Sequence, residues 1–378
     1  MEKEQAQKLM FELLRVMLAR KASDLFITAG FPPAIKVDGR LTPVSNQTLT
    51  PQHTMELARS IMTDKQAAEF DTTQECNFAI SPPGIGRFRC NAFVQQSRVG
   101  LVLRTITTQI PNFDQLGLPS VLKDVVMSKR GLVILVGGTG SGKSTSLAAM
   151  IGHRNEHSYG HIITIEDPVE YVHEHKNSII TQREVGVDTE GWMPALKNTL
   201  RQAPDVILIG EIRDRETMDY AIAFAETGHL CLSTLHANSA NQALDRIINF
   251  FPEERRQQLL MDLSLNLKSF VSQRLIPRKD GPGRVAAIEI LLNSPLISEL
   301  IFKGEVHEIK EIMKKSRELG MVTFDQALFD LFEQGHISYE DALRNADSIN
   351  DLRLKIKLDS KTAKDADRGG GLDHLEIM

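Results

Sequence analysis

The stretch from Gly131 to Arg154 constrains the fold most, because it joins an apolar run, a glycine-rich turn and a helical pattern. Residues 137–144 read GGTGSGKS, which matches G-x-x-x-x-G-K-[ST], the P-loop motif. Glycines let backbone N–H groups converge on phosphate oxygens without Cβ clashes, and a following helix N-terminus adds partial positive charge. The run "LVILV" before the motif predicts a buried strand, and "STSLAAMIGHR" after it predicts a helix. The segment therefore predicts a nucleoside triphosphate site, in which Lys143 meets the β- and γ-phosphates and Ser144 ligates Mg²⁺.

Apolar runs alternate with helical patterns from about residue 121 onward. The expected strands are "GLVILVG", "HIITIED", "SIITQ", "DVILIGE" and "HLCLSTLH", with "RVAAIEILL" as a last one. Continuous apolar strands between helices indicate a sheet that is covered on both faces, so the fold class is α/β. After about residue 292 the pattern predicts short helices, through "QALFDLFEQG" and "SYEDALRNA".

The first 105 or so residues have a different character. Short runs of alternating apolar and polar residues between Gly and Pro turns predict a small α+β domain with an antiparallel sheet. In the leading segment, Met10, Leu13, Leu14 and Met17 recur at helical spacing, which predicts an amphipathic helix on a core; a helix on a membrane surface is the alternative. The expected parts are 1–106 (N-terminal domain), 107–120 (linker), 121–292 (nucleotide domain), 293–357 (helical region) and 358–378 (a polar, glycine-rich, disordered tail).

Acidic residues follow two of the expected buried strands. In "PDVILIGEIRDRE" the apolar run ends directly at Glu211, and "HIITIED" ends at Glu166 and Asp167. Since such strands end at the phosphate edge of the sheet, Glu211 is expected to hold Mg²⁺ through water. Glu170, just after Pro168, is favoured as the base that activates water, with Glu166 in support. A solvated strand end or a helix N-cap is the alternative for each acid.

Two histidines flank the strand in "ETGHLCLSTLHANSA", His229 before it and His236 after it. A histidine at the carboxyl edge of the sheet can hydrogen-bond a γ-phosphate or its water. His229, at the start of the strand, needs a turn that brings it back to the site. An ordinary core or surface histidine is the alternative for both.

Charge and composition exclude several classes of function. The net charge of −5, from 49 acidic and 44 basic residues, disfavours a broad phosphate-backbone surface, so no nucleic-acid partner is expected. The three cysteines, Cys76, Cys90 and Cys231, form no CxxC pair and are expected to be small core residues. No apolar run approaches the ~18 residues that a membrane helix needs, and a cytoplasmic protein is expected.

Five motifs occur in order between residues 137 and 238: "GGTGSGKST", "ITIEDPVEYVH", "QREVGVDTEGW", "TLRQAPDVILIGEIRD" and "AETGHLCLSTLHA". Together they resemble the secretion-superfamily ATPases of type IV pilus machines. The resemblance continues through "KASDLFITAG", "IGRFRCNAF" and "NQALDRIINFFPEERR" and covers nearly the whole chain. It implies a PAS-like N-terminal α+β domain joined to a RecA-like P-loop ATPase core, with C-terminal helices, in a homo-hexameric ring.

Within this family the chain is similar to the PilT-like retraction branch, and most of all to its accessory members. Extension ATPases carry a longer N-terminal region and a four-cysteine zinc site, which are missing from this sequence. "PLISEL", Pro295 to Leu300, stands where PilT-like proteins carry AIRNL. The resemblance implies a cytoplasmic motor at the inner face of the inner membrane, at the pilus base. There it would assist a PilT-like ATPase on the pilus platform protein, with a change of angle between its domains about the 107–120 segment.

The resemblance also implies roles for single residues. Glu170 corresponds to the catalytic glutamate of the family's Asp box, Glu211 to the metal-site acid of its Walker B segment, and His229 falls in its His box. The residues implied at the phosphates of ATP are Gly137, Gly138, Thr139, Gly140, Ser141, Gly142, Lys143, Ser144 and Thr145.

Family members also supply arginines to a neighbouring subunit's nucleotide. The candidates are Arg87, Arg89 and Arg104, with Arg201 and Arg213 as alternatives. An arginine finger raises the rate by about 10³ to 10⁵, so a ring is expected to hydrolyse ATP faster than a lone subunit.

Three other functions are weighed against this one. A DNA-handling RecA-like motor is disfavoured by the charge and by few stacking aromatics, one tryptophan and four tyrosines. A non-catalytic or regulatory ring subunit that aids another motor is disfavoured by the intact Lys143, Glu170 and Glu211. A pilus extension or secretion ATPase is the third alternative.

Overall fold

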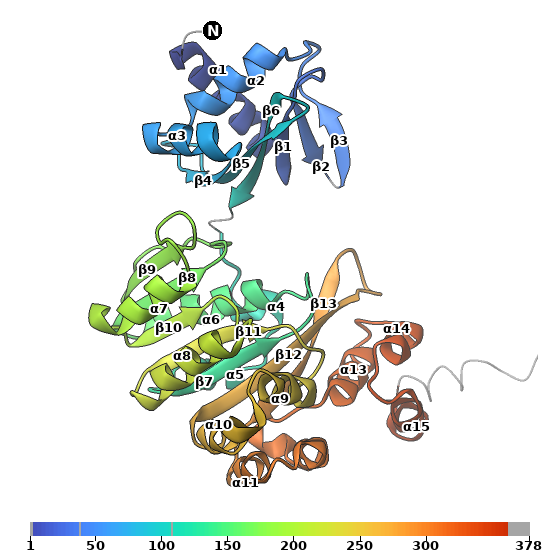
Figure 1. Cartoon of the computed structure of the whole chain (residues 1–378). Helices are drawn as coiled ribbons and strands as arrows, with labels where there is room; N and C mark the ends of the chain where they lie inside the picture. Colours follow the sequence, from blue (N-terminus) through green and yellow to red (C-terminus); the bar gives the residue numbers. More distant parts are fainter. Residues whose placement is uncertain (1–2, 38, 107–108, 362–378) are drawn as a thin grey trace, which may run out of the picture. The chain divides into compact units, whose positions relative to one another are not determined.

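The computed structural model describes residues 3–37, 39–106 and 109–361, which fall into two compact units (Figure 1). The first is the chain up to Gln109 with Asp167–His173 and Arg183–Pro194. The second is Ile110–Glu166, Glu174–Gln182 and the chain from Ala195 on. Thr107 and Thr108 of the expected linker, and residues 362–378 of the expected tail, lie outside the described residues.

A six-stranded antiparallel sheet forms the centre of the first unit, in the order β3-β2-β1-β6-β5-β4. Its strands are β1 (Asp24–Ile27), β2 (Ala34–Val37), β3 (Arg40–Pro43), β4 (Glu75–Ile80), β5 (Arg87–Gln95) and β6 (Arg98–Ile106). Its helices are α1 (Lys3–Ala19), α2 (Pro51–Ser60) and α3 (Asp64–Thr73). Met10, Leu13, Leu14 and Met17 of α1 are buried in the core of this unit, which confirms the predicted core helix. The predicted antiparallel sheet is confirmed as well.

A seven-stranded sheet forms the centre of the second unit, in the order β13-β12-β7-β11-β10-β8-β9. Its strands are β7 (Gly131–Val136), β8 (His161–Glu166), β9 (Ile179–Glu184), β10 (Val206–Ile209), β11 (Leu230–Leu235), β12 (Leu267–Pro277) and β13 (Arg284–Leu292). The strands from β12 to β8 run parallel, and β13 is antiparallel to β12. The helices of this half of the chain are α4 (Phe113–Leu116), α5 (Val121–Val126), α6 (Lys143–His157), α7 (Trp192–Thr199), α8 (Arg215–Glu226), α9 (Ala240–Asn249) and α10 (Glu253–Asn266).

Helices cover the second sheet on both faces, as the apolar runs predict. Val133 and Leu135 of β7 share a core with Leu147 and Met150 of α6 on one face. On the other face α8 packs against β7 and β11 (Figure 1). Every residue of β7 is buried, because it lies in the middle of a sheet with two covered faces. The α/β class predicted from the sequence is confirmed.

Strand β12 is not among the strands that the apolar runs predict. Its sequence, LKSFVSQRLIP, mixes apolar residues with Ser269, Ser272 and Gln273, and that pattern reads as neither a buried strand nor a helix. All three polar residues are nonetheless buried. Strand β12 lies directly beside β7, so these polar groups stand next to the strand that leads into the P-loop.

The end of the described chain is helical. It forms α11 (Pro295–Lys303), α12 (Ile309–Lys315), α13 (Phe324–Glu333), α14 (Tyr339–Arg344) and α15 (Ile349–Asp359). Helices α13 to α15 share a core, which includes Ile276 of β12 and Ala287 of β13. Leu352 and Ile356 of α15 are buried in it, so α15 is part of the folded unit. Leu358 and Asp359, at the start of the expected tail, form its last turn.

Two further expectations concern cysteines and membranes. Cys76, Cys90 and Cys231 are free and buried, as expected of small core residues. Within the described ranges, no helix combines the length and the apolar character that a bilayer crossing requires.

Glu289 of β13 is a buried carboxylate that ties the sheet to α9. Its Oε1 accepts a hydrogen bond from the Ala240 N–H at 2.9 Å, and only 1% of the residue is exposed. Burial raises the pKa of Glu289. A pKa raised in the folded state means that the carboxyl contributes its full stability at low pH and loses it as the pH rises through the folded pKa.

We therefore expect Glu289→Gln to stabilise the protein at pH 8. The amide oxygen can accept the same Ala240 N–H without a buried charge. A gain of about 1 kcal/mol corresponds to about 2–4 °C in Tm for a unit of this size. Thermal unfolding at pH 8 and pH 4.5 measures it, with the difference expected to shrink at the lower pH. A variant that is less stable than the wild type at pH 8 would contradict the role given to the buried charge.

Candidate functional site

The P-loop lies at the carboxyl edge of the second sheet. It leaves β7 after Val136 and enters α6 at Lys143. Strands β7, β11, β10 and β8 are parallel neighbours, so the segments that follow them meet at one edge. Glu166 is the last residue of β8, and Glu211 and His236 follow the ends of β10 and β11.

The glycines of the loop are required by its backbone and by close contacts. Gly140 and Gly142 have φ values of +74° and +89°, in the left-handed region that disfavours side chains. A Cβ at Gly137 would lie 2.4 Å from Ser141 Oγ, and one at Gly142 would lie 2.6 Å from Gln273 Nε2. A side chain at Gly137 or Gly142 would therefore meet its neighbours too closely, and one at Gly140 would force an unfavourable backbone conformation.

The polar groups of the loop fit a bound anion. The Lys143 side chain is buried and its Nζ donates to the carbonyl oxygens of Gly137 and Gly138 at 2.9 and 2.8 Å. The Ser141 hydroxyl is buried, and no hydrogen-bond partner for it is found within the described ranges. An unpaired buried hydroxyl and a buried ammonium in a glycine loop fit phosphate oxygens.

Gln273 of β12 packs against the end of the P-loop and the start of α6. Its Oε1 accepts a hydrogen bond from Ser146 Oγ at 2.7 Å, and its side chain lies against Gly142. This residue is not among the predicted site residues. Its contact with Ser146 spans 127 positions of the sequence, and no local pattern marks it.

Glu211 is held at the same edge by the end of the neighbouring strand β11. The Ile212 N–H donates to the Thr234 carbonyl at 2.9 Å, and Thr234 Oγ1 donates to the Gly210 carbonyl at 2.7 Å. The Glu211 carboxylate lies 3.2 Å from His236 Nε2 and forms an ion pair with Arg213.

Asp214 and Arg215, which follow Arg213, have structural partners. Asp214 caps α8, because its Oδ1 accepts the Thr217 N–H at 2.9 Å. Arg215 lies 3.8 Å from Asp219 on the next turn of the helix. The charged residues that follow this buried strand therefore have two separate explanations. Glu211 is the acid of the candidate site and pairs with Arg213 and His236, whereas Asp214 and Arg215 belong to the start of α8.

The two histidines lie at opposite ends of β11. The His229 carbonyl accepts the Gly131 N–H at 3.0 Å, and its ring Nδ1 lies 3.1 Å from Thr227 Oγ1. This is the end of the sheet where β7 begins, away from the P-loop of the same chain. His236 follows the other end, beside Glu211. The role given to His229 stays a prediction, and His236 is the histidine at the phosphate edge.

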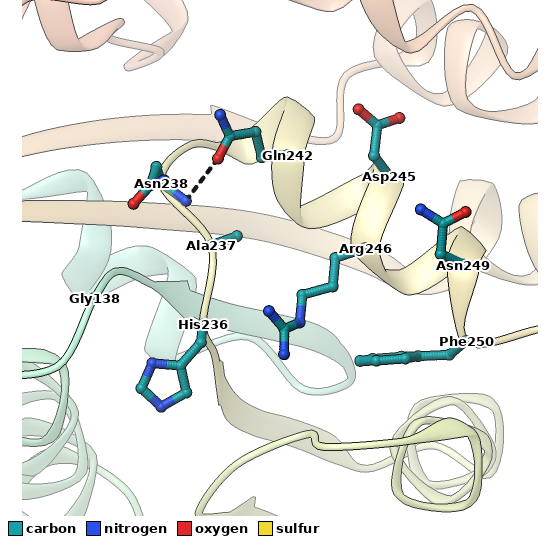
Figure 2. A pocket seen from close by; sticks show the side chains of 9 residues that line it. All are labelled: Gly138, His236, Ala237, Asn238, Gln242, Asp245, Arg246, Asn249 and Phe250. Carbon is teal, nitrogen blue, oxygen red and sulfur yellow. Dashed lines mark hydrogen bonds between the residues drawn. The ribbon is translucent and has the colours of Figure 1, made fainter.

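A cavity of about 570 Å³ opens beside the start of the P-loop. Figure 2 shows His236 and Gly138 on one side of it and the side chains of α9 on the other. Arg246 belongs to α9, and Phe250 follows the last residue of this helix. The Arg246 guanidinium lies 5.9 Å from the centre of the Phe250 ring. Asn238, whose N–H donates to Gln242 Oε1 at 3.1 Å, forms another part of the wall.

Glu166 ends β8 at the same edge. Its Oε1 accepts hydrogen bonds from Thr164 Oγ1 at 2.6 Å and from Gln182 Nε2 at 3.3 Å. These bonds hold the carboxylate on its own strand and the neighbouring one. Its supporting role in catalysis stays a prediction.

Glu170 belongs to the first unit, in the segment Asp167–His173. The segment is held by Glu184, whose Oε2 accepts the N–H of Val169, the residue before Glu170, at 3.1 Å. Burial raises the pKa of Glu184, against the opposing effects of this bond and of nearby Arg89 and Arg87. Glu184 is not among the predicted site residues, and the base role of Glu170 stays a prediction.

The arginines predicted to act in trans lie on β5 and β6 of the first unit. Arg87 and Arg89 alternate with the buried Phe88 and Cys90, so both lie on the face of β5 away from the core. Arg104 Nε donates to Asp24 at 2.8 Å, which gives it a structural partner. Which of the three acts in trans stays a prediction.

The acidic residues of the site fit a metal ion that is bound together with the phosphates of a nucleotide. No cluster of three or more His, Cys, Asp or Glu residues that could hold a metal is found within the described ranges. Mg²⁺ in nucleotide sites keeps several waters and takes only one or two protein ligands beside phosphate oxygens. The assignment of Ser144 and Glu211 to such a cation stays a prediction.

A glycine-rich loop, a buried lysine and an acid–histidine pair at one edge of a parallel sheet define a P-loop nucleotide-binding protein with a RecA-like core. The chain belongs to the type II/IV secretion system protein family, whose model matches residues 1–344. The resemblance seen in the sequence motifs is thereby confirmed.

Three proteins show how similar this chain is to other members of the family in sequence and in structure. The chain is 62% identical to the type IV pilus ATPase PilU of Pseudomonas aeruginosa, over 94% of this chain and 93% of that one. It is 44% identical to the type IV pilus retractation ATPase PilT of the same organism, over 89% of this chain and 97% of that one. The crystal structure of the pilus retraction motor PilT with bound ADP superposes with a TM-score of 0.85 at 40% identity, over 91% of this chain and 98% of that one.

Proposed function

We propose that this chain is an ATP-hydrolysing motor subunit that works as a homo-hexamer and assists a PilT-like ATPase in type IV pilus retraction. The observation that carries the proposal is a complete P-loop, with Glu211 and His236 beside it, in a chain 62% identical to PilU over nearly its whole length. Twitching motility and pilus disassembly are the processes it would serve.

Substrate binding would begin at the loop. The Lys143 ammonium, which now contacts the Gly137 and Gly138 carbonyls, would turn to the β- and γ-phosphates of ATP, and the Ser141 hydroxyl would gain an oxygen acceptor. Ser144 and Glu211 would hold Mg²⁺, which neutralises phosphate charge when it is bound.

Hydrolysis would need a base and groups that respond to the terminal phosphate. Glu170 would accept a proton from the attacking water, with Glu166 in support and Glu184 fixing the Glu170 segment. His236, paired with Glu211, would contact the γ-phosphate side of the site. His236 would thus have the role that the family resemblance implies for His229.

The ring would complete the site. Arg87, Arg89 or Arg104 of a neighbouring subunit would supply positive charge to the transferring phosphate, an effect worth about 10³ to 10⁵ in rate. The ring would act on the platform protein at the inner face of the inner membrane.

A deletion strain tests the proposal, complemented with the wild type, with Lys143→Ala or with an empty vector. Loss of the protein is expected to leave piliated cells that twitch poorly, and Lys143→Ala is expected not to restore twitching. Bald cells would indicate an extension ATPase instead. Full rescue by Lys143→Ala would indicate a non-catalytic ring subunit.

A pull-down against the PilT-like ATPase and the platform protein tests the partners. A version that ends at Lys361 separates the contribution of residues 362–378. An earlier end point would remove α15, whose Leu352 and Ile356 are buried, and would damage the fold.

A further inference from the structure

We propose that Arg274 of β12 is a positioning residue that couples the C-terminal helices α13 to α15 to the loop that carries His236. We call the segment from His236 to Asn238 the His236 loop; it follows β11 and lines the cavity beside the P-loop. The inference rests on the proposed ATP site and deepens it. It names the residue through which a terminal phosphate and the C-terminal helices would influence one another.

Arg274 lies on the part of β12 that runs past the end of β7. The pairing of β12 with β7 ends at Ser272, so the next two residues of β12 lie beside the P-loop. Successive side chains of a strand point to opposite faces of the sheet. Gln273 contacts Ser146 of α6 on one face, and Arg274 contacts Asn238 on the other.

One guanidinium joins the His236 loop to the helices. Its Nη2 donates to the Asn238 carbonyl at 3.1 Å and to Asp347 Oδ1 at 2.7 Å, and its Nη1 donates to the Asn345 carbonyl. The centre of the Phe324 ring lies 3.8 Å from the guanidinium carbon. Phe324 is the first residue of α13, and the other two helix-side partners lie between α14 and α15. Because the donors of a guanidinium form a rigid planar fork, these groups are held in fixed relative positions.

The helix side of this connection is firmly anchored. Asp347 also forms an ion pair with Lys310, and its N–H donates to Asp325 Oδ1 at 2.8 Å. The Ser348 N–H donates to the other oxygen of the same carboxylate at 3.2 Å. A displacement of the guanidinium would therefore be transmitted to the backbone between α14 and α15.

The loop side lies at the end of the site where a terminal phosphate would react. His236, two residues before Asn238, lies 3.2 Å from the Glu211 carboxylate. Figure 2 shows His236 and Asn238 on the same loop in the wall of the cavity. A terminal phosphate that contacts His236 would thus act on a loop whose backbone is held by Arg274.

The bond to Asn238 is the observation that goes beyond a structural anchor. An arginine that only fixed the helices would need no contact with the His236 loop. Coupling between two sites is reciprocal in binding free energy. If the helices bias the loop, a ligand that contacts the loop must bias the helices. A triphosphate and ADP, which lacks the terminal phosphate, should then affect the α14–α15 connection differently.

Hydrogen–deuterium exchange of the full chain tests this difference, with Mg·ADP and the non-hydrolysable Mg·AMP-PNP as probes. In the wild type, the peptide that contains residues 346–350 is expected to exchange at rates that differ about threefold between the two probes. In Arg274→Lys the difference is expected to vanish, because lysine keeps a charge beside Asp347 and lacks the fork that also holds Asn238. Arg344→Lys, at an exposed arginine of α14, is the matched control and is expected to keep the difference.

Steady-state kinetics give a second measurement. Arg274→Lys is expected to lower kcat for phosphate release about tenfold and to leave KM for ATP and the affinity for Mg·ADP within about twofold. Asp347→Asn keeps the size of its side chain and weakens the same connection from the helix side, so kcat is expected to fall about three- to tenfold. Thermal unfolding shows that each variant is folded, and Asp347→Asn carries the test if Arg274→Lys is not.

The outcomes separate the coupling from the ATP site. If neither probe protected the P-loop peptide 137–145 of the wild type, the proposed ATP site would be wrong and the coupling with it. Protection of that peptide, with equal exchange of residues 346–350 for both probes, would overturn the coupling alone. Wild-type kcat in both variants would overturn it too, and equal losses of kcat and of Mg·ADP affinity would reduce Arg274 to a structural residue.

Discussion

Lys143→Ala is expected to weaken Mg·ATP binding by about 10² to 10³-fold and to abolish measurable phosphate release. The Lys143 side chain is buried among the P-loop carbonyls, and the lysine of a P-loop is the one that reaches the β- and γ-phosphates. Loss of two or more charge-assisted hydrogen bonds costs about 3–4 kcal/mol. Calorimetric titration with ATP measures the binding, and a phosphate-release assay measures the turnover.

Lys129→Ala is the matched control, because Lys129 is an exposed lysine near the start of the same domain. It is expected to bind and hydrolyse ATP like the wild type. Thermal unfolding shows whether Lys143→Ala keeps its fold after losing the two contacts with the loop. A folded Lys143→Ala protein that hydrolyses ATP at the normal rate would rule out this loop as the site.

Glu170→Gln is expected to lower phosphate release by about 10² to 10⁴-fold, the usual contribution of a general base. Glutamine keeps the shape of the side chain and cannot take a proton from water. Binding of a non-hydrolysable ATP analogue is expected to stay within about twofold of the wild type, since the P-loop is untouched. The split between turnover and affinity distinguishes a base from a residue that holds the substrate.

Glu174→Gln, a few residues further on and exposed, is the control for Glu170→Gln and is expected to be fully active. If Glu170→Gln kept most of its turnover, the base would be another acid, and Glu166→Gln would be measured next. If it lost affinity and turnover together, Glu170 would act in binding.

The neighbours of the P-loop hold the groups of the site in place. Strand β12 brings Gln273 against Gly142. The hydrogen bond from Thr234 to the Gly210 carbonyl joins the ends of β11 and β10. Glu211 and His236 therefore reach one another from adjacent strand ends, 3.2 Å apart. Such preorganisation lowers the cost of ordering the site when substrate binds.

The sequence by itself determined the elements whose signals are local. The P-loop, the apolar strands around it, the acids at their ends and the core face of α1 all follow from spacing and periodicity within short windows. Six of the seven strands of the second sheet are marked by such runs, and Glu211 is placed correctly at a strand end.

Only the tertiary structure decided which distant groups meet. Strand β12 escaped the pattern because its polar residues are buried by neighbours rather than exposed. Gln273 reaches Ser146 across 127 positions, and His236 rather than His229 stands beside Glu211 because parallel strands bring their carboxyl ends together. The cavity of about 360 Å³ that is lined by Gly142, Gln273 and Leu331 is likewise assembled from segments whose proximity depends on the order of strands in the sheet. Periodicity reports how one segment is buried and carries no information about the partner that buries it.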